Sequence, residues 1–153
     1  MHRFDTILAE QAFFKDVDRR LLEIIAGCAS NARFAADEWI FQEGEDASRF
    51  YLILYGKVAL NAIVPGRGEV TIQTLGEGEV LGWSWLFPPY RWHFGARALE
   101  VTRAIAFDGA CLRMKAEIDH DLGYELLKRF SQTIIERLQA TRLQLLDVYG
   151  VHA

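Results

Sequence analysis

The stretch that decides the fold is FQEGEDASRFYLILYGKV, residues 41–58. Its middle part, Arg49–Tyr55, is aromatic and aliphatic, which is typical of a β-strand. Glycines stand on either side of this segment, at Gly44 and Gly56. Glycine adopts the backbone conformations of tight turns without a steric penalty. The stretch therefore predicts strand, tight turn, strand and a second tight turn.

Similar short segments continue along the chain. Those rich in β-branched or aromatic residues are Glu38–Phe41, Arg49–Tyr55, Lys57–Val64, Glu69–Leu75 and Ala96–Phe107. Turn residues separate them, at residues 44–46, at Gly56 and at residues 65–68. Short strands with turn signals about every ten residues predict a barrel, roll or jelly roll.

Helical periodicity flanks these strands. Apolar residues three and four apart predict an amphipathic helix over Lys15–Ala29. A short helix over Gly109–Ile118 and a long one from near Asp121 to Gly150 follow the strands. The predicted fold is mainly β with flanking helices: a β-roll (double-stranded β-helix, jelly-roll-like) and a long C-terminal dimerisation helix. We expect one domain over 1–153, with N-terminal helices in 5–30, the roll in 31–107 and C-terminal helices in 109–150.

The long helix carries a seam of residues spaced alternately by four and three. Its members are Leu127, Ser131, Ile134, Leu138, Thr141, Leu145 and Val148. Such an a/d pattern packs one helix against another, which predicts a homodimer through residues 127–148. The alternative is that the helix only covers the roll. A second apolar stripe would allow both, and it consists of Leu126, Phe130, Ile135 and Leu146.

Three stretches in this order resemble the cyclic nucleotide-binding domain of the catabolite activator (Crp/Fnr-like) family, of kinase regulatory subunits and of gated channels. They are residues 41–58, residues 75–82 (LGEGEVLG) and residues 136–141 (ERLQAT). The resemblance implies a sensor that binds a small ligand, such as cyclic AMP or cyclic GMP, in the roll and signals through the long helix. Only Val151-His152-Ala153 follows that helix, so the resemblance further implies a stand-alone module without a DNA-binding domain.

In that family a Gly-Glu pair, a short helical turn and an arginine about ten residues later hold the cyclic phosphate and the ribose. Gly82 matches the glycine, but Trp83 replaces the glutamate, and an indole cannot accept a hydrogen bond. The arginine position falls on Trp92 or His93, and Arg91 stands one or two residues early. The ligand-binding residues implied by the resemblance are Gly82, Trp83, Ser84, Trp85, Arg91, Trp92, His93 and Thr141. Among them, Thr141 matches a long-helix residue whose hydroxyl meets the purine.

This aromatic cassette has two interpretations. Trp83, Trp85, Tyr90, Trp92 and His93 could line a pocket for a changed ligand, since such pockets are mostly apolar with a few polar groups. Alternatively the rings fill the former pocket, because each buries enough area to stabilise the fold by about 2 kcal/mol. The chain would then be a ligand-blind scaffold or interaction domain.

Composition argues against several other functions. The formal net charge is −4 and no run of Lys or Arg stands out, so we expect no direct contact with nucleic acid. The longest apolar stretch, Phe50–Tyr55, is too short to span a membrane, and the N-terminus does not resemble a signal peptide. Cys28 and Cys111 are far apart in the sequence, which predicts two unpaired buried thiols in a cytoplasmic protein.

Catalytic and metal-binding patterns are weak. The histidines, at positions 2, 93, 120 and 152, are too scattered for a metal site of the cupin type. The carboxylate pairs Glu77/Glu79 and Asp119/Asp121 stand at turns or helix starts, where acidic residues have structural roles. No phosphate-binding glycine loop is present. We expect no enzymatic activity and no metal.

Overall fold

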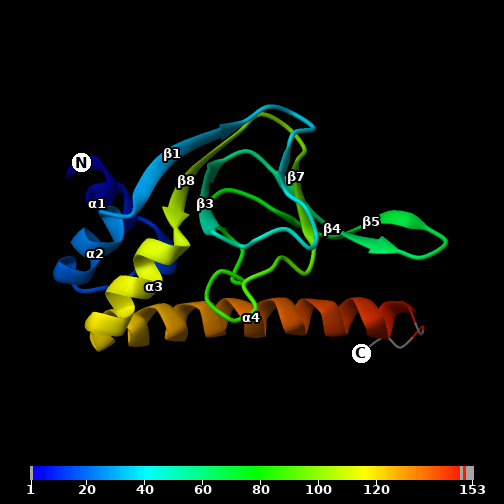
Figure 1. Ribbon diagram of the computed structural model, residues 1–153. Helices are drawn as coiled ribbons and strands as arrows, with labels where there is room; N and C mark the ends of the chain where they lie inside the picture. Colours follow the sequence, from blue (N-terminus) through cyan, green and yellow to red (C-terminus); the bar gives the residue numbers. More distant parts are fainter. Residues whose placement is uncertain (1, 149, 151–153) are drawn as a thin grey trace.

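Two antiparallel four-stranded sheets form the roll in the computed structural model, which describes residues 2–148 and 150 (Figure 1). Their strand orders are β1-β8-β3-β6 and β2-β7-β4-β5. The strands are β1 Ala29–Phe34, β2 Trp39–Phe41, β3 Arg49–Tyr55, β4 Val58–Val64, β5 Gly68–Leu75, β6 Val80–Leu81, β7 Gly95–Ala98 and β8 Thr102–Asp108. The predicted mainly β roll with flanking helices is confirmed.

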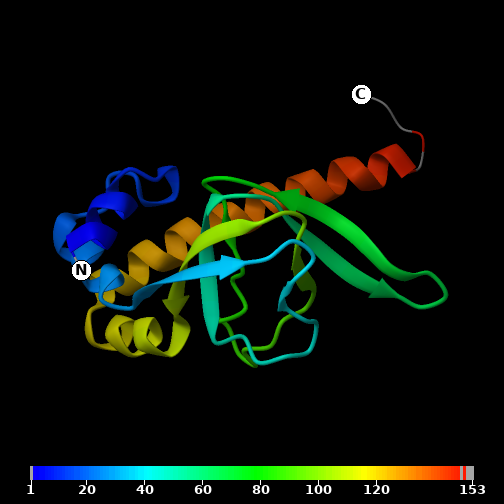
Figure 2. The same ribbon diagram turned by 90° about the horizontal axis from the view of Figure 1, so that it is seen from above.

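Helices close one end and one side of the roll. The helices are α1 His2–Ala9, the 3₁₀ turn η1 Ala12–Phe14, α2 Arg19–Ala26, α3 Gly109–Ile118 and α4 His120–Val148. Figure 1 shows α4 running along the underside of the roll, with α1, α2 and α3 at one end. Seen from above, the β4–β5 hairpin and the end of α4 extend away from those helices (Figure 2).

The first predicted helix is longer than the one observed. We expected Lys15–Ala29, whereas α2 spans Arg19–Ala26. It starts late because the Asp18 carboxylate caps it, accepting a 3.1 Å hydrogen bond from the Arg20 backbone N–H. It ends early because residues from Ala29 onward pair with β8, starting at Phe107. At this end, pairing with a neighbouring strand decides the conformation, although the apolar spacing of the segment fits a helix.

The predicted strand Ala96–Phe107 is two strands. Residues 99–101 separate β7, which pairs with β2 and β4, from β8, which pairs with β1 and β3. The chain therefore changes sheets within this segment. Two further strands, β1 and β6, were not predicted, because each is defined by its partner more than by its own composition.

Alternate residues of β3 serve two separate cores. Tyr51 and Ile53 point into the roll, where both sheets contribute buried side chains. Phe50 and Leu52 point outward into a second core, which the helices cover with residues such as Phe130 of α4. Successive side chains of a strand point to opposite faces, and both faces of β3 are buried. Residues 50–53 are therefore all apolar.

The face of α4 turned toward the roll differs in part from the second apolar stripe that we predicted. Leu126 and Phe130 are buried as expected, but Ile135 and Leu146 are 53% and 41% exposed. Arg137 is buried on this face of α4 instead. The predicted stripe is therefore wrong beyond Phe130.

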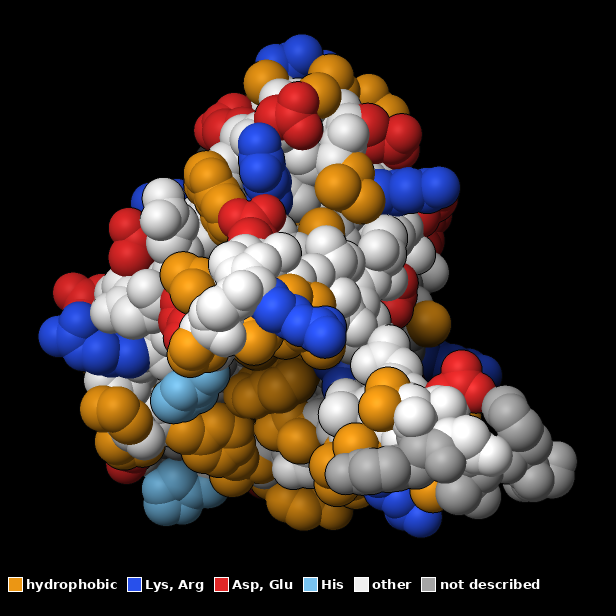
Figure 3. All heavy atoms as spheres, turned by 90° about the vertical axis from the view of Figure 1, so that its right-hand side faces the viewer, with side chains coloured by type: hydrophobic (Ala, Val, Ile, Leu, Met, Phe, Trp, Pro, Cys, Tyr) orange, Lys and Arg blue, Asp and Glu red, His pale blue; other side chains and the backbone are white. Residues whose placement is uncertain are grey.

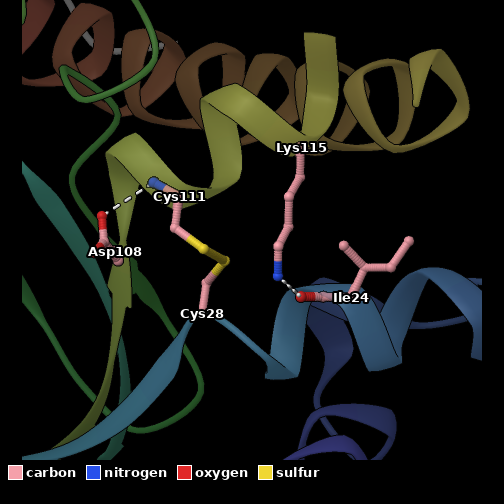
Figure 4. Close-up of a disulfide and its surroundings, with 5 residues drawn as sticks. All are labelled: Ile24, Cys28, Asp108, Cys111 and Lys115. Carbon is pink, nitrogen blue, oxygen red and sulfur yellow. Dashed lines mark hydrogen bonds between the residues drawn. A yellow bond between two sulfur atoms is a disulfide. The ribbon is translucent and has the colours of Figure 1, made fainter. Parts of the chain in front are cut away.

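The prediction of two unpaired thiols is wrong, because Cys28 and Cys111 form a disulfide with Cα atoms 6.0 Å apart (Figure 4). The β1–β8 ladder brings the start of β1 beside the end of β8, and the Asp108 backbone N–H donates to the Cys28 carbonyl at 2.9 Å. Helix α3 then places Cys111 only three residues beyond Asp108. A separation of 83 residues in sequence gave no sign of this closeness.

Residues 2–148 and 150 contain neither a membrane-spanning helix nor a cluster of metal-binding side chains. None of their helices combines the length and the apolar character needed to cross a bilayer. Within the same residues, no three His, Cys, Asp or Glu side chains gather where they could hold a metal ion.

Candidate ligand-binding site

The cassette loop, residues 82–94, connects β6 to β7 and carries most of the predicted site residues. Gly82 begins it with a φ of +96°, a backbone conformation that favours glycine. A Cβ atom at Gly82 would lie 2.4 Å from the ring of Trp92. Gly82 is therefore needed for the close approach of a tryptophan from the same loop.

Trp92 lies inside the roll. Its ring stacks on Phe41 with centroids 3.7 Å apart and an interplanar angle of 7°, and only 4% of the residue is exposed. Its backbone is also fixed, since its N–H donates to the Glu45 carbonyl and its own carbonyl accepts from Gly44. Trp92 thus fills part of the roll's interior, in agreement with the second interpretation of the cassette.

Trp85 lies in the core between the roll and the helices, and its neighbour Ser84 is also buried. Trp85 has no exposed surface and contacts the rings of Phe50 and Phe130 at centroid distances of 4.9 and 5.5 Å. Ser84 is 4% exposed. In this conformation Trp85 attaches the cassette loop to α4, and both residues are inaccessible to a ligand.

Three further predicted residues, Arg91, His93 and Thr141, are on the surface. Arg91 donates from Nη1 to the Gly44 carbonyl at 3.0 Å and lies 3.4 Å from the Asp46 carboxylate. His93 is exposed. Thr141 is exposed as well, and its hydroxyl donates to the Arg137 carbonyl one turn back in α4.

The ring of Trp83 contacts a cation that we did not predict, Arg137. The guanidinium of Arg137 lies over the Trp83 ring, 5.1 Å from its centroid. Trp83 is half-buried and its ring also meets that of Phe94 edge-on. A cation over an indole face is attracted by the ring quadrupole.

Arg137 is a buried cation with an incomplete set of partners. It is 8% exposed, its Nη2 donates to the Val80 carbonyl, and its buried Nη1 has no hydrogen-bond partner among residues 2–148 and 150. Burial lowers the pKa of the Arg137 guanidinium to about 10, while the charges of Glu79 and Glu136 act in the opposite direction. Arg137 is still charged at neutral pH, so the fold holds an incompletely compensated positive charge.

A groove of about 330 Å³ opens beside this arginine, between α4, η1 and the end of β5. Its lining is mostly polar and includes Arg129, whose Nη1 donates to the Phe13 carbonyl at 2.8 Å. The groove is lined by Ala12, Phe13, Gln73, Gly78, Glu79, Val80, Arg129, Gln132, Thr133, Glu136 and Arg137.

Hydrophobic side chains also gather near the C-terminal half of α4. Figure 3 looks from the C-terminal end of this helix and shows them in a recessed area between α4 and the roll. The seam of α4 is largely uncovered, with Leu127, Leu138, Leu145 and Val148 between 46% and 80% exposed. Single exposed apolar side chains are ordinary, whereas these four lie in a row along one helix.

Sequence reasoning missed Arg137, although a signal was present. Leu122, Leu126, Phe130 and Arg137 follow each other at spacings of four, four and seven, and all four are buried. An arginine in register with an otherwise apolar helix stripe has to be desolvated, and such an arginine is a candidate for a functional role.

A family model described as the cyclic nucleotide-binding domain matches residues 32–118. The chain is also 25% identical over 144 residues to a CRP-like cAMP-activated global transcriptional regulator of Mycobacterium tuberculosis. The alignment covers 94% of this chain and 62% of the regulator, so the chain spans about three fifths of that relative's length.

Solved structures agree with this family match. A candidate cyclic nucleotide-binding protein from Geobacter metallireducens has a TM-score of 0.80 and 27% identity, over 90% of this chain and 99% of that one. A cyclic nucleotide-binding domain from Methylobacillus flagellatus also has a TM-score of 0.80, with 19% identity, over 95% and 82% of the two chains. The Thermus thermophilus catabolite activator protein shares the fold, with a TM-score of 0.69 and 22% identity over 90% and 62%. The chain belongs to the cyclic nucleotide-binding domain family.

Proposed function

We propose that this protein is a regulatory module that binds a small anionic ligand of the cyclic nucleotide class where the cassette loop meets α4. Ligand binding would shift α4, and α4 would transmit the shift to the same helix of a second copy. The relatives named above are regulators or binding domains, which supports a sensor over an enzyme. We place its action in the cytoplasm, where regulators of transcription work.

The observation that carries this proposal is the incompletely compensated charge of Arg137. Its guanidinium is buried, pairs with no carboxylate within salt-bridge distance among the described residues, and leaves Nη1 without a partner. A phosphate group would supply both the missing charge and hydrogen-bond acceptors, and arginine binds phosphate in two-pronged geometry. Arg137 would then provide the cation that the sequence assigned to Arg91.

The groove also offers acceptors for a ribose or a base. Trp83 cannot accept a hydrogen bond from a hydroxyl, but the carboxylates of Glu79 and Glu136 line the same groove as Arg137. The face of the Trp83 ring lies against the same cation. Cyclic AMP is the first ligand to test, because the Mycobacterium relative is described as cAMP-activated.

Replacing Arg137 by methionine is expected to weaken nucleotide binding strongly while the protein stays folded. Methionine fills a similar volume and leaves no buried charge, so stability should be unchanged or higher. For the parent, a nucleotide at 100 times its Kd should stabilise the fold by about 2.7 kcal/mol. Loss of the charged contact, worth about 1.5–3 kcal/mol, should weaken binding roughly 10- to 150-fold. Thermal shift and calorimetry with cyclic AMP, cyclic GMP and cyclic dinucleotides measure both effects.

Two matched variants make this test specific. Arg142→Met removes an exposed cation from the same helix and should leave binding unchanged. Arg91→Gln tests the arginine that the sequence suggested. If Arg91→Gln loses binding and Arg137→Met does not, the phosphate contact is at Arg91 and our placement is wrong.

A second function, the ligand-blind scaffold, is favoured by Trp92. That ring occupies the space against Gly82 and stacks on Phe41, so the roll's interior is filled where the cassette loop enters it. The same titrations decide between the two functions. A parent protein that none of the nucleotides stabilises would support the scaffold.

Self-association through α4 has its own test. Leu138 is 59% exposed in the middle of the seam, so Leu138→Lys should place a charge in the proposed dimer contact and give monomers. Gln139→Lys adds the same charge to the adjacent exposed position outside the seam and should leave the dimer intact. Light scattering gives the mass of each. An unchanged mass for Leu138→Lys would rule out a dimer through the seam.

A further inference from the structure

The disulfide lies where three elements meet, and it is one of several ties between them. Cys28 stands between α2 and β1, and Cys111 lies in the first turn of α3 (Figure 4). On the same side of α3, the Lys115 ammonium donates to the Ile24 carbonyl of α2 at 3.5 Å. At the far end of α3, Arg20 of α2 pairs with the Asp119 carboxylate at 2.5 Å. The N-terminal helices and the connector to α4 thus remain joined even without the sulfur bond.

The two cysteines border a depression on the surface. This depression of about 240 Å³ lies over the bond and is lined by both cysteines together with Gly27, Ser30, Arg49, Ala106 and Asp108. Cys28 is 7% exposed, whereas Cys111 is more open. In thiol–disulfide exchange, the attacking thiolate must approach one sulfur along the axis of the S–S bond, so that sulfur must be accessible.

The surroundings of Cys111 favour its thiolate over that of Cys28. Cys111 lies in the first turn of α3, at the end of the helix where the helix dipole gives a partial positive charge. Arg49 lines the depression, and Lys115 lies one turn further along α3. Asp108 opposes these groups, but its carboxylate is occupied by the Cys111 backbone N–H at 3.0 Å. Positive neighbours and helix N-termini are the usual causes of reactive cysteines.

We propose that Cys28 and Cys111 form a reversible thiol–disulfide site, with Cys111 as the attacking thiol and Cys28 as the resolving thiol toward small disulfides such as glutathione disulfide. The Cys111 thiolate attacks one sulfur of the small disulfide and releases the other half as a thiolate. The Cys28 thiolate then attacks the Cys111 sulfur of this mixed disulfide and releases the second half. Two protein thiols are oxidised, one small disulfide is reduced to two thiols, and each departing thiolate takes up one of the two protons lost by the protein.

This reaction would change the connector between the roll and the signalling helix. Helix α3 links β8 directly to α4, and the sulfur bond holds its first turn to the start of β1. With the bond open, the Arg20–Asp119 pair still holds the far end of α3. Oxidation or reduction of the two cysteines would therefore fix or release the first turn of α3, while the rest of the fold stays in place.

The test equilibrates the purified full chain in glutathione buffers from strongly reducing to strongly oxidising, then alkylates free thiols and counts them by mass spectrometry. We expect the chain to carry two free thiols at the reducing end and none at the oxidising end, with recovery when the buffer is reversed. A bond that stays oxidised in every buffer while the urea-unfolded chain is reduced is purely structural, and this result would overturn the proposal. Permanently free thiols would also overturn it.

Single variants test the order of attack. In Cys28→Ser, glutathione should accumulate on Cys111 roughly 3- to 10-fold faster than it accumulates on Cys28 in Cys111→Ser. Adding Arg49→Gln to Cys28→Ser should slow that reaction, whereas Arg103→Gln, which changes an exposed arginine of β8, should not. Circular dichroism confirms that each variant is folded. Equal rates at the two cysteines, or a faster Cys28, would contradict the assigned roles, and the wild-type titration remains informative if a variant does not fold.

Discussion

Replacing Cys111 by serine should lower the free energy of unfolding by about 4–5 kcal/mol. The disulfide connects residues 83 apart. In the chain-entropy model, closing a loop of that length lowers the conformational entropy of the unfolded chain, which raises its free energy by about 4.5 kcal/mol. Because a domain of this size has a total stability of about 5–15 kcal/mol, the bond accounts for a large share of it. Urea unfolding of the variant and of the oxidised parent measures the difference.

The reduced parent is the natural control for this prediction. In the presence of a reductant, the parent should unfold at the same urea concentration as Cys111→Ser, and the variant itself should not respond to the reductant. A parent whose stability is the same with and without reductant would contradict the expected contribution. Such a result would mean that the ladder between β1 and β8 already holds the two ends together.

Truncating Trp85 to alanine should destabilise the protein by about 3–5 kcal/mol, the usual cost of removing a large aromatic side chain from a core. Trp85 has no exposed surface and lies between Phe50 of β3 and Phe130 of α4. Its loss would leave a cavity between the roll and the helix. Thermal unfolding should show a fall in Tm of about 10 °C.

Phe87→Ala is the matched control, since it removes an aromatic ring from the same loop. Phe87 is 40% exposed, and its truncation should cost less than about 1 kcal/mol. Equal losses for the two variants would mean that Trp85 does not anchor the cassette loop. Unchanged self-association of a folded Trp85→Ala would further show that the loop and the dimer contact are independent.

The fold could be predicted well where a segment's own residues set its conformation. Arg49–Tyr55 and Gly109–Ile118 form the expected strand and helix with the expected bounds, because apolar spacing and turn residues act locally. Segment 96–107 was predicted less well, since its division into β7 and β8 depends on which sheet each half joins. The sequence does not predict β1 for the same reason, since its residues are half-buried or exposed and its strand conformation depends on pairing with β8.

The candidate site was predicted less completely than the fold. The sequence locates the altered cassette and identifies Trp83 as the residue without an acceptor. It does not indicate that Trp85 faces the helix core, that Trp92 faces the roll's interior, or that Arg137 lies over Trp83. Neighbouring residues of an irregular loop follow no period, so their directions depend on the packing around them.

The sequence by itself therefore determined the β-roll with its long helix and the family, through local patterns that recur in order along nearly the whole chain. Only the tertiary structure decided the disulfide and the buried cation. Cys28 and Cys111 meet because a strand pairing closes an 83-residue separation, and Arg137 is desolvated because α4 lies against β6 and the cassette loop. Both depend on contacts between distant segments, and residue spacing within a single segment carries no information about such contacts.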